Sequence, residues 1–365
     1  MKSLRKTVLL AATLVLAVPF AVLMAQQSGQ SGPPTPTQQN PPPTPQQGGA
    51  PTTIKVPVNS VLVPVTIKDR EGRLVPDLRR DEFRIFEDNV EQKIDSFRAD
   101  VTPISMLLLL DNDLKSKDAA QVAKSLVSLL AGLSLSDEAS VCRFDQYFHP
   151  GKGFINDQDK LLTELKRTQL DDQPSVNASS PTINNGPSIN GHSATSDAPN
   201  ISGAMINLKN QPTKALDDAV YESAQLLKDR DPQRNRRKII FLISDGVNGV
   251  KFNTHSYDTT IKELLRYDIA VYGVGVGGAF YDRKFERLAK YAKDTGGDVY
   301  YALKSPAMSE LYPKVTEEAR NQYVLSYTPS GTDRGKEYHT IEVRVRREGL
   351  NILAREGYYA GATPR

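Results

Sequence analysis

The middle of the chain alternates between short apolar runs and stretches in which apolar residues recur every three or four positions. Runs of the first kind are typical of strands buried on both faces of a parallel sheet. They occupy residues 104–110, 139–144, 239–243, 269–276 and 299–302. Helical spacing is found over residues 119–130, 161–165, 215–227, 261–266, 285–292 and 308–319. This order predicts an α/β fold with a doubly wound, mostly parallel sheet and helices on both faces.

Period-two alternation, which is typical of half-buried strands, is found on both sides of this region. It covers residues 61–67 and 83–86 before the region, and residues 323–327 and 341–345 after it. Because each piece alone is too short to bury a face, we predict that the two flanking segments pack together as one small β-sandwich-like domain. Two separate β appendages are the alternative.

The N-terminus has the pattern of a secretory signal, with Lys2, Arg5 and Lys6 ahead of an apolar run that ends near Ala25. We therefore predict a signal peptide over residues 1–25, which would remain as a membrane anchor if it is not cleaved. Residues 26–53 are rich in Gln, Pro, Gly, Ser and Thr, and we interpret them as a disordered linker. The expected location is extracytoplasmic: periplasmic, at the cell surface or secreted.

The remaining sequence divides into three parts. Residues 54–101 form the predicted N-terminal β segment, residues 102–320 the α/β domain and residues 321–365 the C-terminal β segment. Within the α/β domain, residues 171–212 are rich in Ser, Asn, Gly and Pro and are far longer than an ordinary connection in such a fold. We interpret them as a flexible insertion.

Charge and cysteine content exclude several classes of protein. The 365-residue chain has 46 basic and 43 acidic residues and a formal charge of +3, which is not the strongly basic character of a nucleic-acid-binding protein. Contact with a membrane is expected only through an uncleaved signal. The one cysteine, Cys142, falls in an apolar run, so intramolecular disulfides are excluded and a buried thiol is expected.

Polar residues directly after the predicted strands are the first candidates for a functional site, because ligands of open parallel sheets bind beyond the carboxyl ends of the strands. Three loops stand out. They are Asp111-Asn112-Asp113-Leu114-Lys115, the segment that begins Thr213-Lys214-Ala215, and Ser244-Asp245-Gly246.

Together these loops resemble those of a von Willebrand factor A domain, and the resemblance covers roughly residues 103–320. In that family an Asp-x-Ser-x-Ser loop, a Thr and an Asp form a metal-ion-dependent adhesion site. The order of segments also resembles the exported bacterial VWFA-related Acidobacterial family, on the stretches 83–88, 323–327 and 357–359. The resemblance implies a binding module that recognises a protein or surface polymer.

The resemblance implies that Asp111, Asp113, Thr213 and Asp245 ligate Mg²⁺ or Mn²⁺. Asp113 stands at the first Ser position and still offers oxygen to a hard cation. Lys115 stands at the second Ser position and Lys214 at the Thr position, and an ammonium has no lone pair to donate. A second hypothesis follows, in which Lys115 or Lys214 replaces the cation with an internal salt bridge. In the third hypothesis, these charged side chains are solvated and form no common site.

Catalysis is not expected from this sequence. Residues 273–278 match G-x-G-x-x-G but follow a late strand, and Ser244 lacks the flanking glycines of a nucleophile elbow. The four histidines lack metal-ligand spacing and are expected at the surface: His149, His192, His255 and His339. We therefore expect a non-enzymatic binding or adhesion module that uses the loops at the carboxyl edge of the sheet. A structural scaffold of a cell-envelope assembly is the alternative, and a hydrolase the third option.

Overall fold

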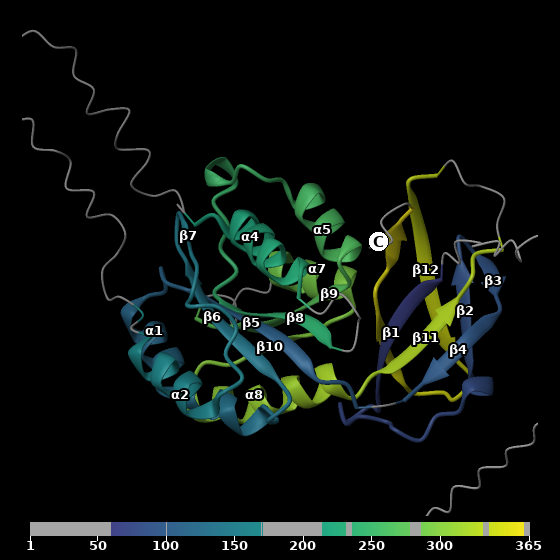
Figure 1. Ribbon diagram of the computed structural model, residues 1–365, viewed down its shortest axis with the longest axis horizontal. Helices are drawn as coiled ribbons and strands as arrows, with labels where there is room; N and C mark the ends of the chain where they lie inside the picture. The colour runs from purple at the N-terminus through teal and green to yellow at the C-terminus, as the bar shows by residue number, and fades with distance from the viewer. Residues whose placement is uncertain are drawn as a thin grey trace, which may run out of the picture. The chain divides into compact units, whose positions relative to one another are not determined.

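The apolar runs form the strands of one six-stranded sheet (Figure 1). The computed structural model describes residues 60–99, 101–168, 170, 214–230, 236–277, 286–330 and 336–360. The strand order is β10-β9-β8-β5-β6-β7, and all neighbours pair in parallel except β7, which is antiparallel to β6. The bounds are β5 Ile104–Asp111, β6 Glu138–Phe144, β7 Phe148–His149, β8 Arg237–Ser244, β9 Ile269–Gly275 and β10 Val299–Tyr301.

Helices cover both faces of this sheet, as Figure 1 shows. One face carries α1 (Ser116–Ser125), the 3₁₀ helix η2 (Leu126–Gly132), α2 (Gln158–Arg167) and α8 (Ser305–Arg320). The other carries α4 (Leu216–Lys228), α5 (Tyr257–Arg266) and α7 (Glu286–Thr295). Alternate residues of β5 belong to the two cores, with Leu108 in one and Leu107 in the other. Burial on both faces explains the uninterrupted apolar runs and confirms the predicted fold class.

Local sequence signals account for several helix starts. The Asp157 carboxylate accepts a hydrogen bond from the Lys160 N–H at the start of α2, and the Ser256 hydroxyl accepts one from the Thr259 N–H at the start of α5. One predicted helix is α-helical only in its first half. The stretch 119–130 begins as α1 and then continues as the tighter η2, which packs on α8.

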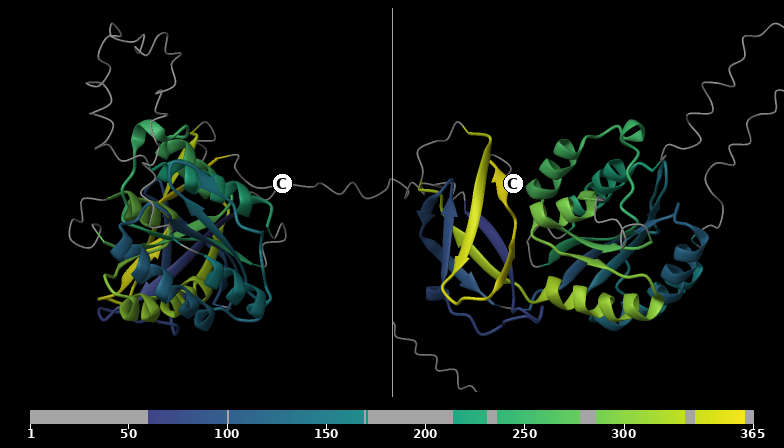
Figure 2. Two further views of the ribbon diagram at one scale, coloured as in Figure 1. Left: turned by 90° about the vertical axis from the view of Figure 1, so that its left-hand side faces the viewer. Right: turned by 180° about the vertical axis from the view of Figure 1, so that it is seen from behind.

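The two flanking segments build one β module, which we define as residues 60–99 and 323–360. One sheet has the order β13-β1-β11-β4 and the other β14-β12-β2-β3, so each sheet combines strands from both ends of the chain. Figure 2 shows these strands lying together. The bounds are β1 Val61–Lys68, the 3₁₀ helix η1 Arg80–Glu82, β2 Phe83–Glu87, β3 Val90–Gln92, β4 Ile94–Arg98, β11 Tyr323–Tyr327, β12 Tyr338–Val345, β13 Asn351–Ala354 and β14 Gly357–Tyr359.

The two sheets of the β module share one apolar core, to which both chain segments contribute. Val63 of β1 and Leu325 of β11 are fully buried in it and stand opposite each other in the antiparallel register. The segments therefore pack together, and two separate β appendages are excluded. The domain bounds given above stay a prediction.

A buried ion-pair cluster joins the β module to the α/β domain. Lys68 Nζ at the end of β1 lies 2.6 Å from Asp298 Oδ2, just before β10, and 2.7 Å from Glu318 Oε2 on α8. Lys68 and Glu318 are almost completely buried. The Tyr300 hydroxyl lies 2.6 Å from Lys68 Nζ and donates to the Glu318 carboxylate. Because burial raises the pKa of the Glu318 carboxyl, its charge depends on this ammonium.

Several sequence predictions concern residues outside the described ranges. They are the signal peptide, the linker, the insertion at residues 171–212, Thr213 and His192. Among the helices that are described, none has the length and apolar character needed to cross a membrane. Cys142 is fully buried in β6, as predicted, and burial raises the pKa of its thiol.

Candidate functional site

Two of the predicted site residues lie side by side because the strands that carry them are neighbours. Asp111 is the last residue of β5, and Asp245 directly follows Ser244, the last residue of β8. These strands pair in parallel, with Leu110 opposite Ile243, so the carboxyl ends of both reach the same edge of the sheet. We call this edge, formed by residues 111–115, 145–147, 214–215 and 244–256, the rim.

The Lys214 ammonium bridges the two carboxylates. Its Nζ donates to Asp111 Oδ2 at 2.9 Å and to Asp245 Oδ1 at 2.9 Å. Asp111 is fully buried and Lys214 is only 4% exposed, so the pair is shielded from solvent. The sequence-based hypothesis of a lysine beside the carboxylates thus agrees with the observed position of Lys214.

The Asp111 carboxylate accepts further hydrogen bonds. The Ser244 hydroxyl donates to Oδ2 at 2.7 Å, and the Asp113 N–H donates to Oδ1 at 3.0 Å. Sequence reasoning assigned Ser244 only to the end of a strand and missed this contact. The contact could have been predicted from the position of Ser244 directly before Asp245. Ser244 ends β8 and Asp111 ends the neighbouring strand β5, so the two residues lie at the same edge of the sheet.

A tight turn orients Asp245. Its Oδ1 accepts a second hydrogen bond, from the Val247 N–H at 3.0 Å, and Gly246 has a φ of +75°, which favours glycine. The Gly246 N–H donates to the Ser244 hydroxyl at 3.0 Å. The Ser-Asp-Gly sequence therefore holds both side chains toward Asp111 and Lys214.

Backbone contacts on both sides hold Lys214 in place. The Ala215 N–H donates to the Asp145 carbonyl in the turn after β6, and the Gly249 N–H donates to the Lys214 carbonyl. The start of α4 is thus held between the loops that follow β6 and β8. This arrangement directs the Lys214 side chain into the gap between the two carboxylates.

Burial and charge act against each other at this site. Burial raises the pKa of the Asp111 carboxyl to about 6, although the Lys214 charge and the Ser244 hydrogen bond oppose this effect. Burial also acts to lower the pKa of Lys214, but the charges of Asp111 and Asp245 outweigh it and raise this pKa above its ordinary value. The opposite charges of Lys214 and the two carboxylates therefore stabilise one another against the effect of burial.

The described residues do not fit a divalent cation between Asp111 and Asp245. An ammonium lies between their oxygens, carries positive charge and has no lone pair to donate. Of the other predicted site residues, Asp113 is half-buried and contacts Asp111 through its backbone. Lys115 is exposed at the position before α1, away from the buried group, and Thr213 lies outside the described residues.

Two acidic residues at the start of α4 organise the rim instead of forming a catalytic pair. Asp217 is buried, and its oxygens accept hydrogen bonds from the Tyr291 hydroxyl and the Asn248 amide. Asp218 accepts from the backbone N–H groups of Thr254 and His255, and these contacts hold its pKa below the ordinary range despite the opposing effect of burial. The two carboxylates therefore have separate structural partners.

Two exposed hydrophobic side chains lie on the segments that contact the Lys214 segment. Tyr147, in the turn after β6, is 67% exposed, and Val250, at the start of the 3₁₀ helix η3 (Val250–Phe252) after β8, is 69% exposed. Asp145, two residues before Tyr147, and Gly249, directly before Val250, make the backbone hydrogen bonds to Ala215 and Lys214. The rim thus combines a buried ion pair with exposed hydrophobic side chains.

Comparison with known proteins agrees with this architecture. The von Willebrand factor type A domain family matches residues 189–314, a stretch that includes Lys214 and Asp245 but begins after Asp111. Domains of this family often mediate protein interaction or adhesion, can bind a metal and are generally not catalytic. No curated protein matches the chain.

The solved structures that the chain matches are distant from it in sequence. The conserved hypothetical protein BatB from Bacteroides thetaiotaomicron is 13% identical, with a TM-score of 0.41 over 59% of this chain and 98% of its own. A von Willebrand factor type A protein from Catenulispora acidiphila is 8% identical, with a TM-score of 0.41 over 84% and 77%. Proximal thread matrix protein 1 from the mussel byssus, with a zinc-occupied MIDAS motif, is 13% identical, with a TM-score of 0.40 over 64% and 49%.

The narrower resemblance to the exported Acidobacterial family stays a prediction. The family match and the doubly wound sheet with its rim agree on the broader assignment. The chain carries a von Willebrand factor type A domain.

Proposed function

We propose that this protein is a non-enzymatic, extracytoplasmic binding module that recognises a protein or surface polymer through the rim, with Lys214 in place of the metal ion. The observation that carries the proposal is the Lys214 ammonium, 2.9 Å from both Asp111 and Asp245. An internal cation keeps the two carboxylates neutralised without an external ion. The rim then needs no metal to keep its shape.

Exposed apolar side chains support recognition at this edge. Interfaces are enriched in aromatic side chains, and a few central residues supply most of the binding energy. Tyr147 and Val250 belong to the segments that contact the Lys214 segment, and their exposed side chains are suited to this role. The extracytoplasmic location rests on the signal-like pattern of residues 1–25.

If Lys214 takes the place of the metal ion, replacing it should create a metal-binding site. Replacing Lys214 with threonine removes the ammonium and supplies the hydroxyl that the family uses at this position. We expect Lys214→Thr to raise the affinity for Mg²⁺ and Mn²⁺ by at least about tenfold, because two carboxylates then face the vacated position. Isothermal titration of the wild type and the variant measures this change, with thermal unfolding in magnesium as a second readout.

Two variants control for unrelated sites. Lys115→Thr removes an exposed lysine from the same rim and should leave metal binding as in the wild type. Lys214→Thr combined with Asp245→Ala should lose the gained binding. Tight Mg²⁺ binding by the wild type that Asp245→Ala abolishes would overturn the proposal and establish an ordinary adhesion-type metal site.

Recognition at the rim is tested with the double variant Tyr147→Ser/Val250→Ser. We expect it to lose at least about tenfold in affinity for partners that the wild type retains from an envelope extract in EDTA, because both apolar contacts are removed. Quantitative mass spectrometry of the retained proteins, followed by titration of the purified partner, measures the loss.

Leu135→Ser is the matched control, because Leu135 is 82% exposed and lies in the loop before β6, at the opposite edge of the sheet. Retention that the rim variant leaves unchanged would contradict recognition at the rim. It would favour the structural scaffold, in which the β module makes the main contact.

A further inference from the structure

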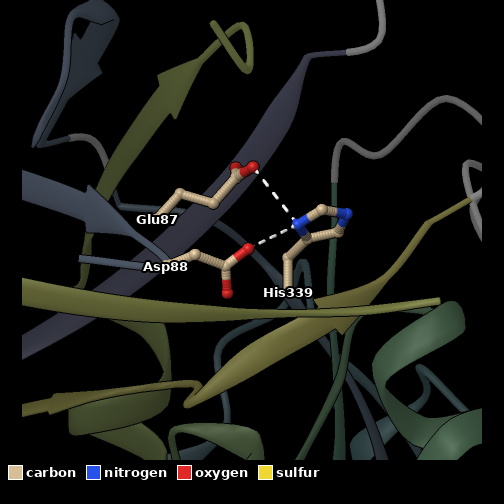
Figure 3. A group of neighbouring side chains, drawn as sticks. All are labelled: Glu87, Asp88 and His339. Atoms are coloured by element: carbon tan, nitrogen blue, oxygen red, sulfur yellow. Dashed lines mark hydrogen bonds and ion pairs between the residues drawn. The ribbon is translucent and has the colours of Figure 1, made fainter. Parts of the chain in front are cut away.

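Three side chains of the β module, none of them part of the rim, converge on one another (Figure 3). Glu87 ends β2, Asp88 follows it in the turn to β3, and His339 lies on β12. His339 Nδ1 is 2.8 Å from Asp88 Oδ2 and 3.5 Å from Glu87 Oε1. The sequence-based expectation of a surface position is wrong for His339, which is 7% exposed because the pairing of β12 with β2 and β14 places it between strands.

The oxygens that face away from His339 have other partners. Glu87 Oε2 accepts hydrogen bonds from the Tyr327 hydroxyl at 2.6 Å and the Tyr358 hydroxyl at 3.2 Å. Asp88 Oδ1 accepts from Lys336 Nζ at 2.6 Å and from the Thr340 N–H and hydroxyl at 3.1 Å each. These contacts orient both carboxylates so that Oε1 and Oδ2 are directed toward the imidazole, as Figure 3 shows. Outer contacts of this kind orient the ligands of metal sites.

The spacing of the three inward-facing atoms suits a metal ion. All three lie within 4.8 Å of one another. Zinc binds imidazole nitrogen and carboxylate oxygen at about 2.0–2.2 Å, so neighbouring ligands of a tetrahedral site are about 3.3 Å apart. The observed separations of 2.8 Å and 3.5 Å from Nδ1 lie on either side of that value. Only small side-chain shifts would be needed to receive the ion.

Burial and orientation favour a built site over a chance grouping. Glu87 is 5% exposed, and the His339 ring stacks on Tyr358 with ring centroids 5.2 Å apart, which restricts its rotation. Asp88 is half-buried and gives an ion a way in from solvent. Two carboxylates converge here, so a divalent cation would offset the repulsion between their negative charges.

We propose that Glu87, Asp88 and His339 form a binding site for a divalent transition-metal ion, with zinc as the preferred ion. Glu87 Oε1, Asp88 Oδ2 and His339 Nδ1 are the ligands, and a fourth position remains for water or a donor from a partner. The ion would take the place of the hydrogen on Nδ1, and the neutral imidazole would then carry its one ring hydrogen on Nε2. The site is independent of the rim and of the function proposed for it.

The test is a zinc titration of the tag-free, EDTA-stripped protein against a chromophoric chelator. We expect one ion per chain to compete with the chelator and to raise the melting temperature by about 5 °C at saturating zinc. Asp88→Asn and His339→Gln should each weaken zinc binding by at least about 100-fold. In the wild type, Co²⁺ should give a visible absorption spectrum that is lost in His339→Gln.

His255→Gln is the matched control. His255 Nδ1 lies 2.9 Å from Asp218 Oδ1, so the pair resembles that of His339 and Asp88 but lacks the second carboxylate, and zinc binding should be unchanged. Asp245→Ala should also leave it unchanged, which separates this site from the rim. Circular dichroism of each metal-free variant establishes that it is folded. The proposal would be overturned if the wild type failed to compete with the chelator, or if Asp88→Asn and His339→Gln bound zinc as tightly as the wild type. His339 would then serve only as a hydrogen-bonding partner of the carboxylates.

Discussion

Replacing Lys214 with methionine is expected to lower the free energy of unfolding by about 3–5 kcal/mol at neutral pH. Methionine fills a similar volume but leaves the Asp111 carboxylate, which is fully buried, without its ammonium partner. A buried charge without a partner is far more costly than a missing surface contact. Chemical denaturation followed by circular dichroism measures the loss.

Two further variants separate the ion pair from packing. Lys115→Met changes an exposed lysine of the same rim and should alter stability by less than about 0.5 kcal/mol. Lys214→Met/Asp111→Asn removes both charges and should regain part of the stability lost in the single variant. A single variant as stable as the wild type would show that Lys214 does not neutralise Asp111.

Replacing Lys68 with methionine is expected to have an effect of similar size, again about 3–5 kcal/mol, because it leaves Glu318 buried and unpaired where the β module meets the α/β domain. The loss should depend on pH. Burial already raises the pKa of Glu318, so its ionised form disfavours the folded state at pH values above the pKa of the unfolded chain. As the pH falls toward about 4, Glu318 takes up a proton and the stability difference from the wild type should narrow.

The matched control for this cluster is Lys262→Met. Lys262 pairs with Glu337 between the same two parts of the chain, but both side chains are largely exposed, so the expected loss of stability is far smaller than that of Lys68→Met. Unfolding curves at several pH values measure both variants. A Lys68→Met difference that stays constant or grows on acidification would contradict the assignment of the loss to the Glu318 charge.

Most of the secondary structure was predictable because it follows from local periodicity. The run 104–110 became β5 because both faces of a parallel sheet are buried, and the spacing over 215–227 became α4 because only one face of that helix packs on the sheet. Positions directly after parallel strands necessarily meet at one edge. The sequence alone therefore brought Asp111 and Asp245 together and singled out the two lysines.

The choice between Lys115 and Lys214 required the tertiary structure. Both stand at family positions that carry hydroxyl groups, and periodicity does not distinguish them. Backbone contacts with Asp145 and Gly249, residues distant in sequence, direct Lys214 inward, whereas Lys115 remains exposed before α1. The position of Lys214 between the two carboxylates thus depends on loops that follow three different strands.

The cluster at His339 could not be predicted from the sequence. His339 and Asp88 are 251 positions apart and meet only because β12 pairs with β2 across the whole chain. Alternation in each segment predicted strands and their joint packing, but a strand's pattern does not specify its partner or its register. The sequence by itself determined the elements, the doubly wound sheet and the carboxylates at the rim. Non-local strand pairing and backbone contacts between loops decided which charged side chains meet, because those interactions join segments that no local pattern relates.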